Sequence, residues 1–167
     1  DMSGGAVSVG RYFTEMLDPT MTWDDVAEMI ELWGGEFCLK GVMSQEDAIK
    51  AKELGATGIV VSNHGGRQLD GSRAPFDQLQ EIVDAVGDDI DVIMDSGIQR
   101  GSHVLKALAA GAKAVGGGRF YLYALAAAGQ AGVERALEIM RTEIERNMRL
   151  MGVSKISELN RNHLRYR

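Results

Sequence analysis

Short apolar runs and longer amphipathic segments alternate along most of the chain. The apolar runs predict short strands at 37–39, 58–61, 92–94 and 114–115. Amphipathic segments predict helices that follow them at 44–55, 75–87, 102–111 and 121–151. An earlier apolar face predicts a helix over 23–33 with Thr22 as its N-cap. Residues 1–17 are rich in glycine and serine and predict a loop, and 156–167 predict a short helix and a tail.

The predicted strands and helices repeat at the spacing of βα units. The steps from Lys40 to His64, to Asp95 and to Gly117 are 24, 31 and 22 residues. Continuous apolar strands that alternate with helices indicate a parallel sheet. Polar and glycine-rich residues follow the strands rather than precede them, which favours an α/β barrel with its chemistry at the carboxyl ends of the strands. A doubly wound open sheet remains the alternative, because it gathers chemistry at the same edge.

Composition narrows the classes of function. The 167 residues carry a formal net charge of -6, which argues against a nucleic-acid partner. The single cysteine, Cys38, excludes an internal disulfide framework, fits a reducing compartment and is expected to be a buried strand residue. No run of apolar residues has the length of a membrane-spanning helix, and no histidine, cysteine and carboxylate spacing is typical of a metal site.

The loop after the second predicted strand has the most specific chemistry. It reads Ser62-Asn63-His64-Gly65-Gly66-Arg67, and its two glycines allow a sharp turn between the histidine and the arginine. A histidine can take or give a proton near neutral pH, and an arginine can bind a carboxylate through its planar fork. Residues three apart on such a loop can address adjacent atoms of one small acid.

The other strand ends offer an anion site. Lys40 ends the first apolar run and could stabilise an anion at the mouth of a barrel. The segments 95–97 and 116–119 each precede a predicted helix, so backbone N–H groups would point toward a bound ligand. In barrels, phosphate binds after the seventh and eighth strands, and Arg119 adds a charge there.

Residues 62–70 resemble the signature of the FMN-dependent 2-hydroxy-acid dehydrogenases and oxidases. This family includes the cytochrome-type L-lactate dehydrogenases, the glycolate oxidases and the mandelate dehydrogenases. The resemblance extends in order and spacing to the segments Asp18-Pro19-Thr20, Trp33-Gly34-Gly35, Leu39-Lys40-Gly41-Val42, Asp95-Ser96-Gly97-Ile98 and Gly118-Arg119. It covers the chain from about residue 17 to its end.

The resemblance implies a fold, a cofactor and a set of site residues. The fold would be the C-terminal half, about four βα units, of a (β/α)8 TIM barrel, with 1–17 a loop remnant and 18–167 the half-barrel domain. The cofactor would be FMN. His64 would be the active-site base, or acid partner, of the substrate hydroxyl, and Arg67 would bind the substrate carboxylate. The residues implied to bind the cofactor are Lys40, Ser62, Asp95, Ser96, Gly97, Gly118 and Arg119; no metal site is implied.

The implied reaction oxidises an (S)-2-hydroxy acid, with L-lactate favoured, to the 2-oxo acid. The electron acceptor would be oxygen, a quinone or a cytochrome, and the full-length protein would be a homo-oligomer that is cytoplasmic or peripheral at the inner membrane. Gln99 departs from the family pattern, which has arginine there, so FMN would bind more weakly unless Arg100 or Arg119 compensates.

Two alternatives to this reading remain open. One is a non-catalytic half-barrel fragment that binds a phosphorylated ligand or a complementary half. The other is a phosphate-binding barrel enzyme without flavin. Because the first four barrel strands are absent from this chain, we expect the isolated chain to need a complementary half for activity.

Overall fold

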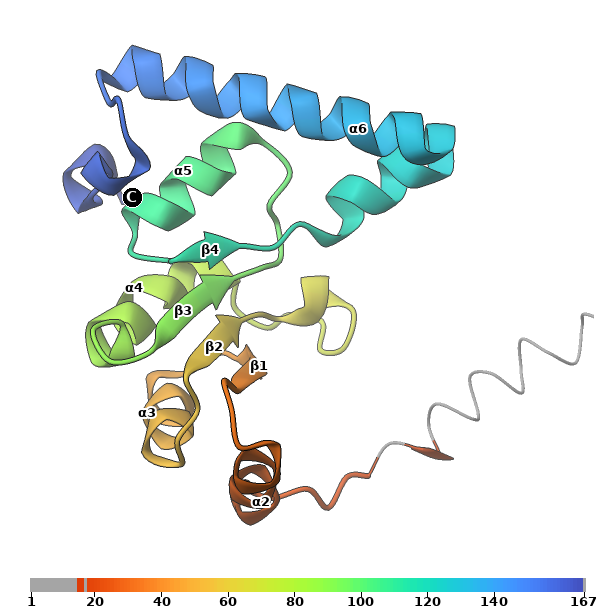
Figure 1. Cartoon of the computed structure of the whole chain (residues 1–167), viewed down its shortest axis with the longest axis vertical. Helices are drawn as coiled ribbons and strands as arrows, with labels where there is room; N and C mark the ends of the chain where they lie inside the picture. The colour runs from red at the N-terminus through yellow and green to blue at the C-terminus, as the bar shows by residue number, and fades with distance from the viewer. Residues whose placement is uncertain (1–14, 17, 167) are drawn as a thin grey trace, which may run out of the picture. The chain divides into compact units, whose positions relative to one another are not determined.

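The structure is a computed structural model that describes residues 15–16 and 18–166 (Figure 1). Residues 1–34 and 35–167 form two separate compact units. Of the loop predicted at 1–17, only 15 and 16 lie within the described residues, so that prediction and the domain boundary at 18 stay predictions.

The described part of the first unit is built around helix α2, Trp23–Trp33. Its predicted bounds are confirmed. Thr22 precedes the helix in an extended conformation, and its N–H donates a 2.6 Å hydrogen bond to Asp25 in a capping box. Gly34 ends the helix in the left-handed conformation, which glycine adopts without strain.

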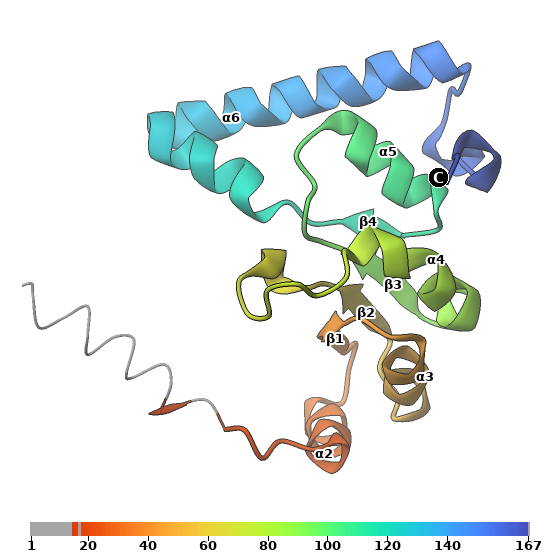
Figure 2. The ribbon, with the colours of Figure 1, turned by 180° about the vertical axis from the view of Figure 1, so that it is seen from behind.

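The second unit contains four parallel strands whose order in the sheet follows the chain (Figures 1 and 2). They are β1 (Cys38–Val42), β2 (Gly58–Val61), β3 (Asp91–Met94) and β4 (Ala114–Val115). The intervening helices are α3 (Gln45–Glu53), α4 (Pro75–Val86) and α5 (Gly101–Ala109), and α6 (Gly118–Met151) follows β4. The predicted succession of four βα units is therefore confirmed.

The two faces of the sheet differ in burial. Ile59 and Val92 are paired in register and fully buried, on the face against which the helices pack. Val60 and Ile93 occupy the next register positions and are only half-buried. Cys38 lies on β1 and is exposed, so its expected burial is wrong. The difference in burial between Ile59 and Val60, and between Val92 and Ile93, arises because successive side chains of a strand point to opposite faces of the sheet.

Several helix bounds shift by one to three residues from the sequence prediction, and three further features differ from it. Strand β1 continues to Val42, so Lys40 lies within the strand rather than after it. Residues His64–Gly66 form a 3-10 turn, η1. Helix α6 is broken at Ala128 and Gly129, and Figure 1 shows the chain doubling back there before it runs across α5. Gly129 adopts a positive φ of 58°, which an uninterrupted helix cannot contain.

The C-terminal segment contains two short 3-10 turns, η2 (Ile156–Glu158) and η3 (Arg161–His163). The expected short helix is therefore present only as these turns. Arg161 forms an ion pair with Asp84 of α4 at 2.5 Å, and the rings of Phe76 and Tyr166 stack with their centroids 6.1 Å apart. These contacts attach the end of the chain to α4.

Helices α5 and α6 cross very closely at Gly101. A side chain at this position would overlap Glu143 and the backbone of Ile144 at 2.6 Å. The buried carboxylate of Glu143 accepts hydrogen bonds from the Gly101 N–H at 2.8 Å and from Arg100 Nε at 2.8 Å. These contacts, the Arg100 bond first, lower the pKa of Glu143 to about 2. The carboxylate thus joins the N-terminus of α5 to α6.

We predict that Glu143→Gln lowers the free energy of unfolding by about 1 to 3 kcal/mol, since a hydrogen-bonded charge is lost from a buried position. The folded-state pKa of Glu143 lies below the ordinary 4.5, so the stabilisation is present above about pH 4.5 and is lost as the pH falls toward 2. Urea unfolding measured from pH 2 to 7 tests this. Glu145→Gln, which removes an exposed carboxylate on the same helix, is the matched control and should change stability little. Equal effects of the two substitutions would contradict the prediction.

Candidate functional site

The loops at the carboxyl ends of the strands surround a cavity of about 260 Å³. The strand β1, the η1 turn, the loop between β3 and α5, and the start of α6 all contribute to it. Its lining residues are Lys40, His64, Gly65, Arg67, Gln68, Asp95, Ser96, Gly97, Ile98, Gln99, Gly118, Arg119, Phe120 and Leu122. Parallel strands that end at one edge bring these distant segments together.

The η1 turn is shaped by its own polar side chain and its glycines. Asn63 Oδ1 accepts a hydrogen bond from the Gly66 N–H at 3.2 Å, and Asn63 Nδ2 donates to the Arg73 carbonyl at 3.3 Å. His64, Gly65 and Gly66 all have positive φ angles, which is uncommon for a histidine. This tight turn leaves both His64 and Arg67 exposed at the cavity.

Gly41 makes room for the imidazole of His64. A Cβ atom at position 41 would lie 3.0 Å from the Cε1 atom of His64, closer than ordinary packing allows. The φ angle of Gly41 is +100°, so a side chain would be strained there as well. The strand residue that follows Lys40 thereby sets where the His64 ring can lie.

Lys40, which lies within β1, connects this strand to the residues that follow β2 and β3. Its ammonium lies 3.1 Å from the carboxylate of Asp95, which follows β3, and donates a 3.0 Å hydrogen bond to Ser62, which follows β2. Ser62 is buried, and its hydroxyl also accepts from the His64 N–H at 3.1 Å. Burial by itself raises the pKa of Asp95, but the hydrogen bonds from Ser62, Ser96 and Lys40 outweigh that effect and lower it. Asp95 is therefore a carboxylate at neutral pH.

Two contacts from later strands hold Gly65 on both sides. The Gly65 N–H donates to Ser96 Oγ at 2.9 Å, and its carbonyl accepts from Arg119 at 2.6 Å. A side chain at position 65 would lie 2.7 Å from the Arg119 guanidinium, so only glycine fits without displacing it. The turn that carries His64 is thus positioned by residues 31 and 54 positions later in the chain.

One end of the cavity is suited to an anion. Helix α6 begins at Gly118 without a side-chain cap, so its first N–H groups are open to a ligand, and Arg119 lies beside them. The positions that a Cβ would take at Gly97 and Gly118 have no atom within 4 Å. This open space beside uncapped N–H groups fits a phosphate group.

Gln99 lines this cavity, whereas Arg100 does not. The Arg100 guanidinium pairs with Glu143 at 2.5 Å, on the side where α5 meets α6. Of the two arginines considered as substitutes for the charge missing at position 99, only Arg119 therefore lies at the cavity.

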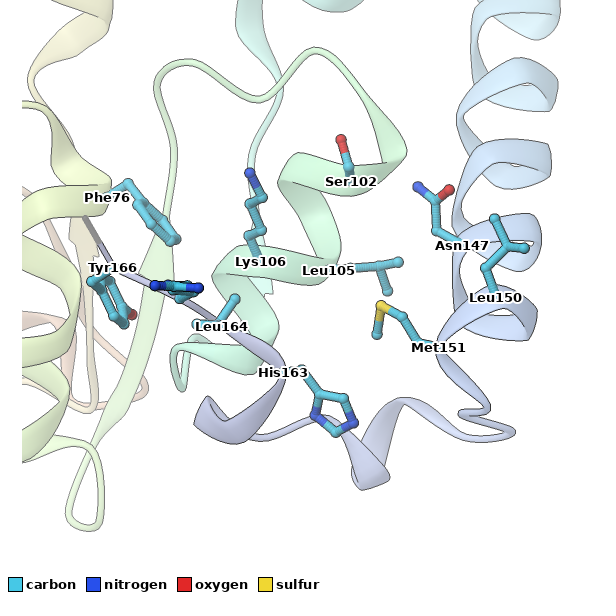
Figure 3. Close-up of a pocket in the computed structure, with 11 residues that line it drawn as sticks. Phe76, Ser102, Leu105, Lys106, Asn147, Leu150, Met151, His163, Leu164 and Tyr166 are labelled. Atoms are coloured by element: carbon cyan, nitrogen blue, oxygen red, sulfur yellow. The ribbon is translucent and has the colours of Figure 1, made fainter.

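A larger cavity of about 370 Å³ lies outside the strand ends, between α5, the end of α6 and the C-terminal segment (Figure 3). Its walls are mainly apolar, with Leu105, Leu150 and Met151 on one side and Phe76 and Tyr166 on the other. None of the residues to which the sequence assigned chemistry lines it. The smaller cavity is therefore the candidate site.

The structure brings most of the sequence-predicted residues together, although their roles stay predictions. Eight line the cavity: Lys40, His64, Arg67, Asp95, Ser96, Gly97, Gly118 and Arg119. Ser62 does not line it but is buried and accepts a hydrogen bond from Lys40, which does. Sequence reasoning missed Gln68, Phe120 and Leu122 as lining residues and Asn63 as the residue that shapes the turn. Their only signal was their position inside the 62–70 motif, for Asn63 and Gln68, or just after Arg119, for Phe120 and Leu122.

Across residues 15–16 and 18–166, no group of three or more histidine, cysteine, aspartate or glutamate side chains is arranged to hold a metal ion. Within the same residues, the helices are too short or too polar to cross a membrane.

Comparison with known proteins identifies the family. Residues 2–166 match the profile of the FMN-dependent dehydrogenases. The chain belongs to the FMN-dependent dehydrogenase family. It is 48% identical over 154 residues to the L-lactate dehydrogenase (cytochrome) of Saccharomyces cerevisiae, with 89% of the chain and 26% of that protein covered. It is 49% identical over 144 residues to the pre-mycofactocin synthase of Mycobacterium tuberculosis, with 86% and 36% covered.

Family members of known structure share the fold. A soluble mutant of the membrane-associated (S)-mandelate dehydrogenase from Pseudomonas putida superposes with a TM-score of 0.87 at 38% identity. The match covers 90% of this chain and 43% of that one. The four βα units are accordingly part of a (β/α) barrel, as the sequence predicted. The chain spans less than half the length of each of these relatives.

We predict that Gly41→Ala displaces the His64 imidazole, because the new methyl group would occupy space that the ring now borders. NMR chemical shifts of the His64 ring protons should change. Gly71→Ala is the matched control, since Gly71 also has a positive φ but has no atom within 4 Å of its Cβ position. It should cause similar backbone strain without moving the ring. Unchanged His64 shifts in Gly41→Ala would refute this steric role.

Proposed function

We propose that the protein to which this chain belongs oxidises an (S)-2-hydroxy acid, with L-lactate favoured, to the 2-oxo acid with FMN as cofactor. The observation that carries the proposal is the single cavity that holds His64, Arg67 and the open N-terminus of α6. A base, a carboxylate-binding group and a phosphate-binding end are the three elements that this reaction needs in one place.

The substrate would be held by its carboxylate on the Arg67 guanidinium, which can form two parallel hydrogen bonds to it. This orients the neighbouring hydroxyl toward His64, three residues earlier in the same turn. His64 takes the hydroxyl proton as the carbon is oxidised, since a neutral imidazole is an effective base near neutral pH. The two residues thus act on adjacent groups of one small acid.

The residues present fit FMN. Its phosphate would lie at the N-terminus of α6 with Arg119, where the missing side chains of Gly97 and Gly118 leave open space. Lys40 would place a positive charge by the ring system, held by Asp95 and Ser62. When bound, FMN supplies the two-electron redox chemistry. The chain itself supplies the proton acceptor, the carboxylate clamp and the fixed charges.

The names of the relatives support a 2-hydroxy acid as the class of substrate more strongly than they support L-lactate itself. One is named a lactate dehydrogenase and another a mandelate dehydrogenase, but an equally similar relative is named pre-mycofactocin synthase. We propose oxygen, a quinone or a cytochrome as electron acceptor, a homo-oligomer, and a cytoplasmic or peripheral membrane location.

The test is anaerobic reduction of the FMN-loaded protein, at its native length, by L-lactate, glycolate and (S)-mandelate. Loss of flavin absorbance with at least one acid supports the proposal, and a subsequent comparison of acceptors identifies the route of the electrons. FMN binding without reduction by any 2-hydroxy acid would reject it in favour of a non-catalytic, phosphate-binding role.

We predict that His64→Gln and Arg67→Lys affect different kinetic constants. His64→Gln should lower kcat about 10²- to 10⁴-fold, because the proton acceptor is lost. Arg67→Lys should act mainly by raising KM, because a lysine cannot bind a carboxylate through a planar fork. Steady-state kinetics on both variants, with FMN content measured by absorbance, tests the assignment. A similar kcat for His64→Gln and the unmodified protein would exclude His64 as the base.

We predict that Gln99→Arg tightens FMN binding, because it adds a positive charge to the phosphate end of the cavity. The expected gain is about tenfold at low salt and smaller at high salt, since exposed charges are screened. Fluorescence titration with FMN measures it, and riboflavin, which lacks the phosphate, is the control ligand. An equal gain for riboflavin would show that Gln99 does not face the phosphate.

A further inference from the structure

Ser96 has an unusual backbone conformation. Its φ angle is +70°, and among the described residues His64 is the only other non-glycine residue with a positive φ. Serine is disfavoured in this region by its Cβ atom, and glycine is not. Such a conformation persists only where surrounding contacts enforce it, and it is often found at functional sites.

Two hydrogen bonds of the Ser96 hydroxyl enforce this conformation. The hydroxyl donates to Asp95 Oδ1 at 2.8 Å and accepts from the Gly65 N–H at 2.9 Å. Asp95 is in turn paired with Lys40 at 3.1 Å. The half-buried hydroxyl therefore connects a fixed carboxylate to the backbone of the η1 turn.

This connection matters because Gly65 lies between the two residues proposed to handle the substrate. Gly65 directly follows His64 and precedes Arg67 by two positions. The turn is bonded to the end of β2 through the Ser62 hydroxyl, which accepts from the His64 N–H. Its hydrogen bond to the segment after β3 is made by the Gly65 N–H to the Ser96 hydroxyl. Loss of that hydroxyl would leave the Gly65 N–H without this acceptor.

We propose that Ser96 is a positioning residue for the substrate-binding turn. Its hydroxyl holds the Gly65 N–H and so fixes His64 and Arg67 relative to Asp95 and Lys40. This inference rests on the proposed function, since it concerns how that site is held. It assigns to Ser96 a role toward the substrate loop rather than toward the cofactor alone.

The strained backbone makes the proposal testable with a pair of variants. Ser96→Gly removes the hydroxyl and relieves the strain, whereas Ser96→Ala removes the hydroxyl and keeps the strain. A purely structural role predicts that Ser96→Gly, the more stable variant, is also the more active one. A positioning role predicts that both lose activity alike although their stabilities differ.

The experiment compares both variants with the unmodified protein at its native length, loaded with FMN. We expect the Gly65 amide to exchange with solvent at least tenfold faster in both, and kcat/KM for the hydroxy acid to fall about tenfold in both, as loss of one hydrogen bond implies. FMN affinity should fall by a smaller factor than kcat/KM, and the unfolding temperature should be higher for Ser96→Gly than for Ser96→Ala. Ser154→Ala, which removes an exposed hydroxyl bonded to Glu158, is the control and should leave all of these unchanged.

Contrary results separate the two proposals. Unchanged Gly65 exchange, or faster exchange with an unaltered kcat/KM, would overturn the role of Ser96 and leave the proposed function standing. Absence of 2-hydroxy-acid oxidation by the unmodified, FMN-loaded protein would instead reject the proposed function.

Discussion

The site depends on one ammonium group. Lys40 reaches Asp95 at 3.1 Å and Ser62 at 3.0 Å, and so joins β1 to the residues that follow β3 and β2. The pair is partly exposed, and such pairs contribute little to the free energy of unfolding. Its importance is geometric, because Asp95 anchors Ser96 and Ser62 anchors His64. Because the Gly65 N–H also donates to Ser96, these contacts form a closed ring that returns to Lys40.

Backbone conformation is the second determinant of the site. Positive φ angles occur at Gly41, at 64–66 and at 96–97, all beside the cavity. Four of these residues are glycines, which adopt such angles freely. The other two are His64 and Ser96, which both have polar contacts that hold them there. Among the described residues, the only two non-glycine residues with positive φ angles thus both line the cavity.

The sequence was sufficient to predict the four βα units, because short apolar runs of two to four residues differ from the 3.6-residue periodicity of the amphipathic helices between them. It also located eight of the lining residues, since chemistry at parallel strands gathers at one edge. It could not predict that Lys40 lies inside β1 or that α6 breaks at Gly129, because both depend on pairing and packing. The sequence pattern around Arg100 also could not predict its hydrogen bond to Glu143, 43 positions later in the chain. Cys38 is exposed because β1 is buried less completely than β2 and β3, and the apolar pattern of a strand does not predict how completely it is covered.

The order of the sheet, β1-β2-β3-β4, bears on how the chain acquires its structure. Each strand pairs with its predecessor, so every new βα unit can add to an edge that already exists as the ribosome extends the chain. The η1 turn, in contrast, depends on contacts with segments later in the chain. It belongs to the second unit, but the two residues that hold Gly65, Ser96 and Arg119, come from the third and fourth units. The geometry of the η1 turn is therefore complete only when all four βα units are folded.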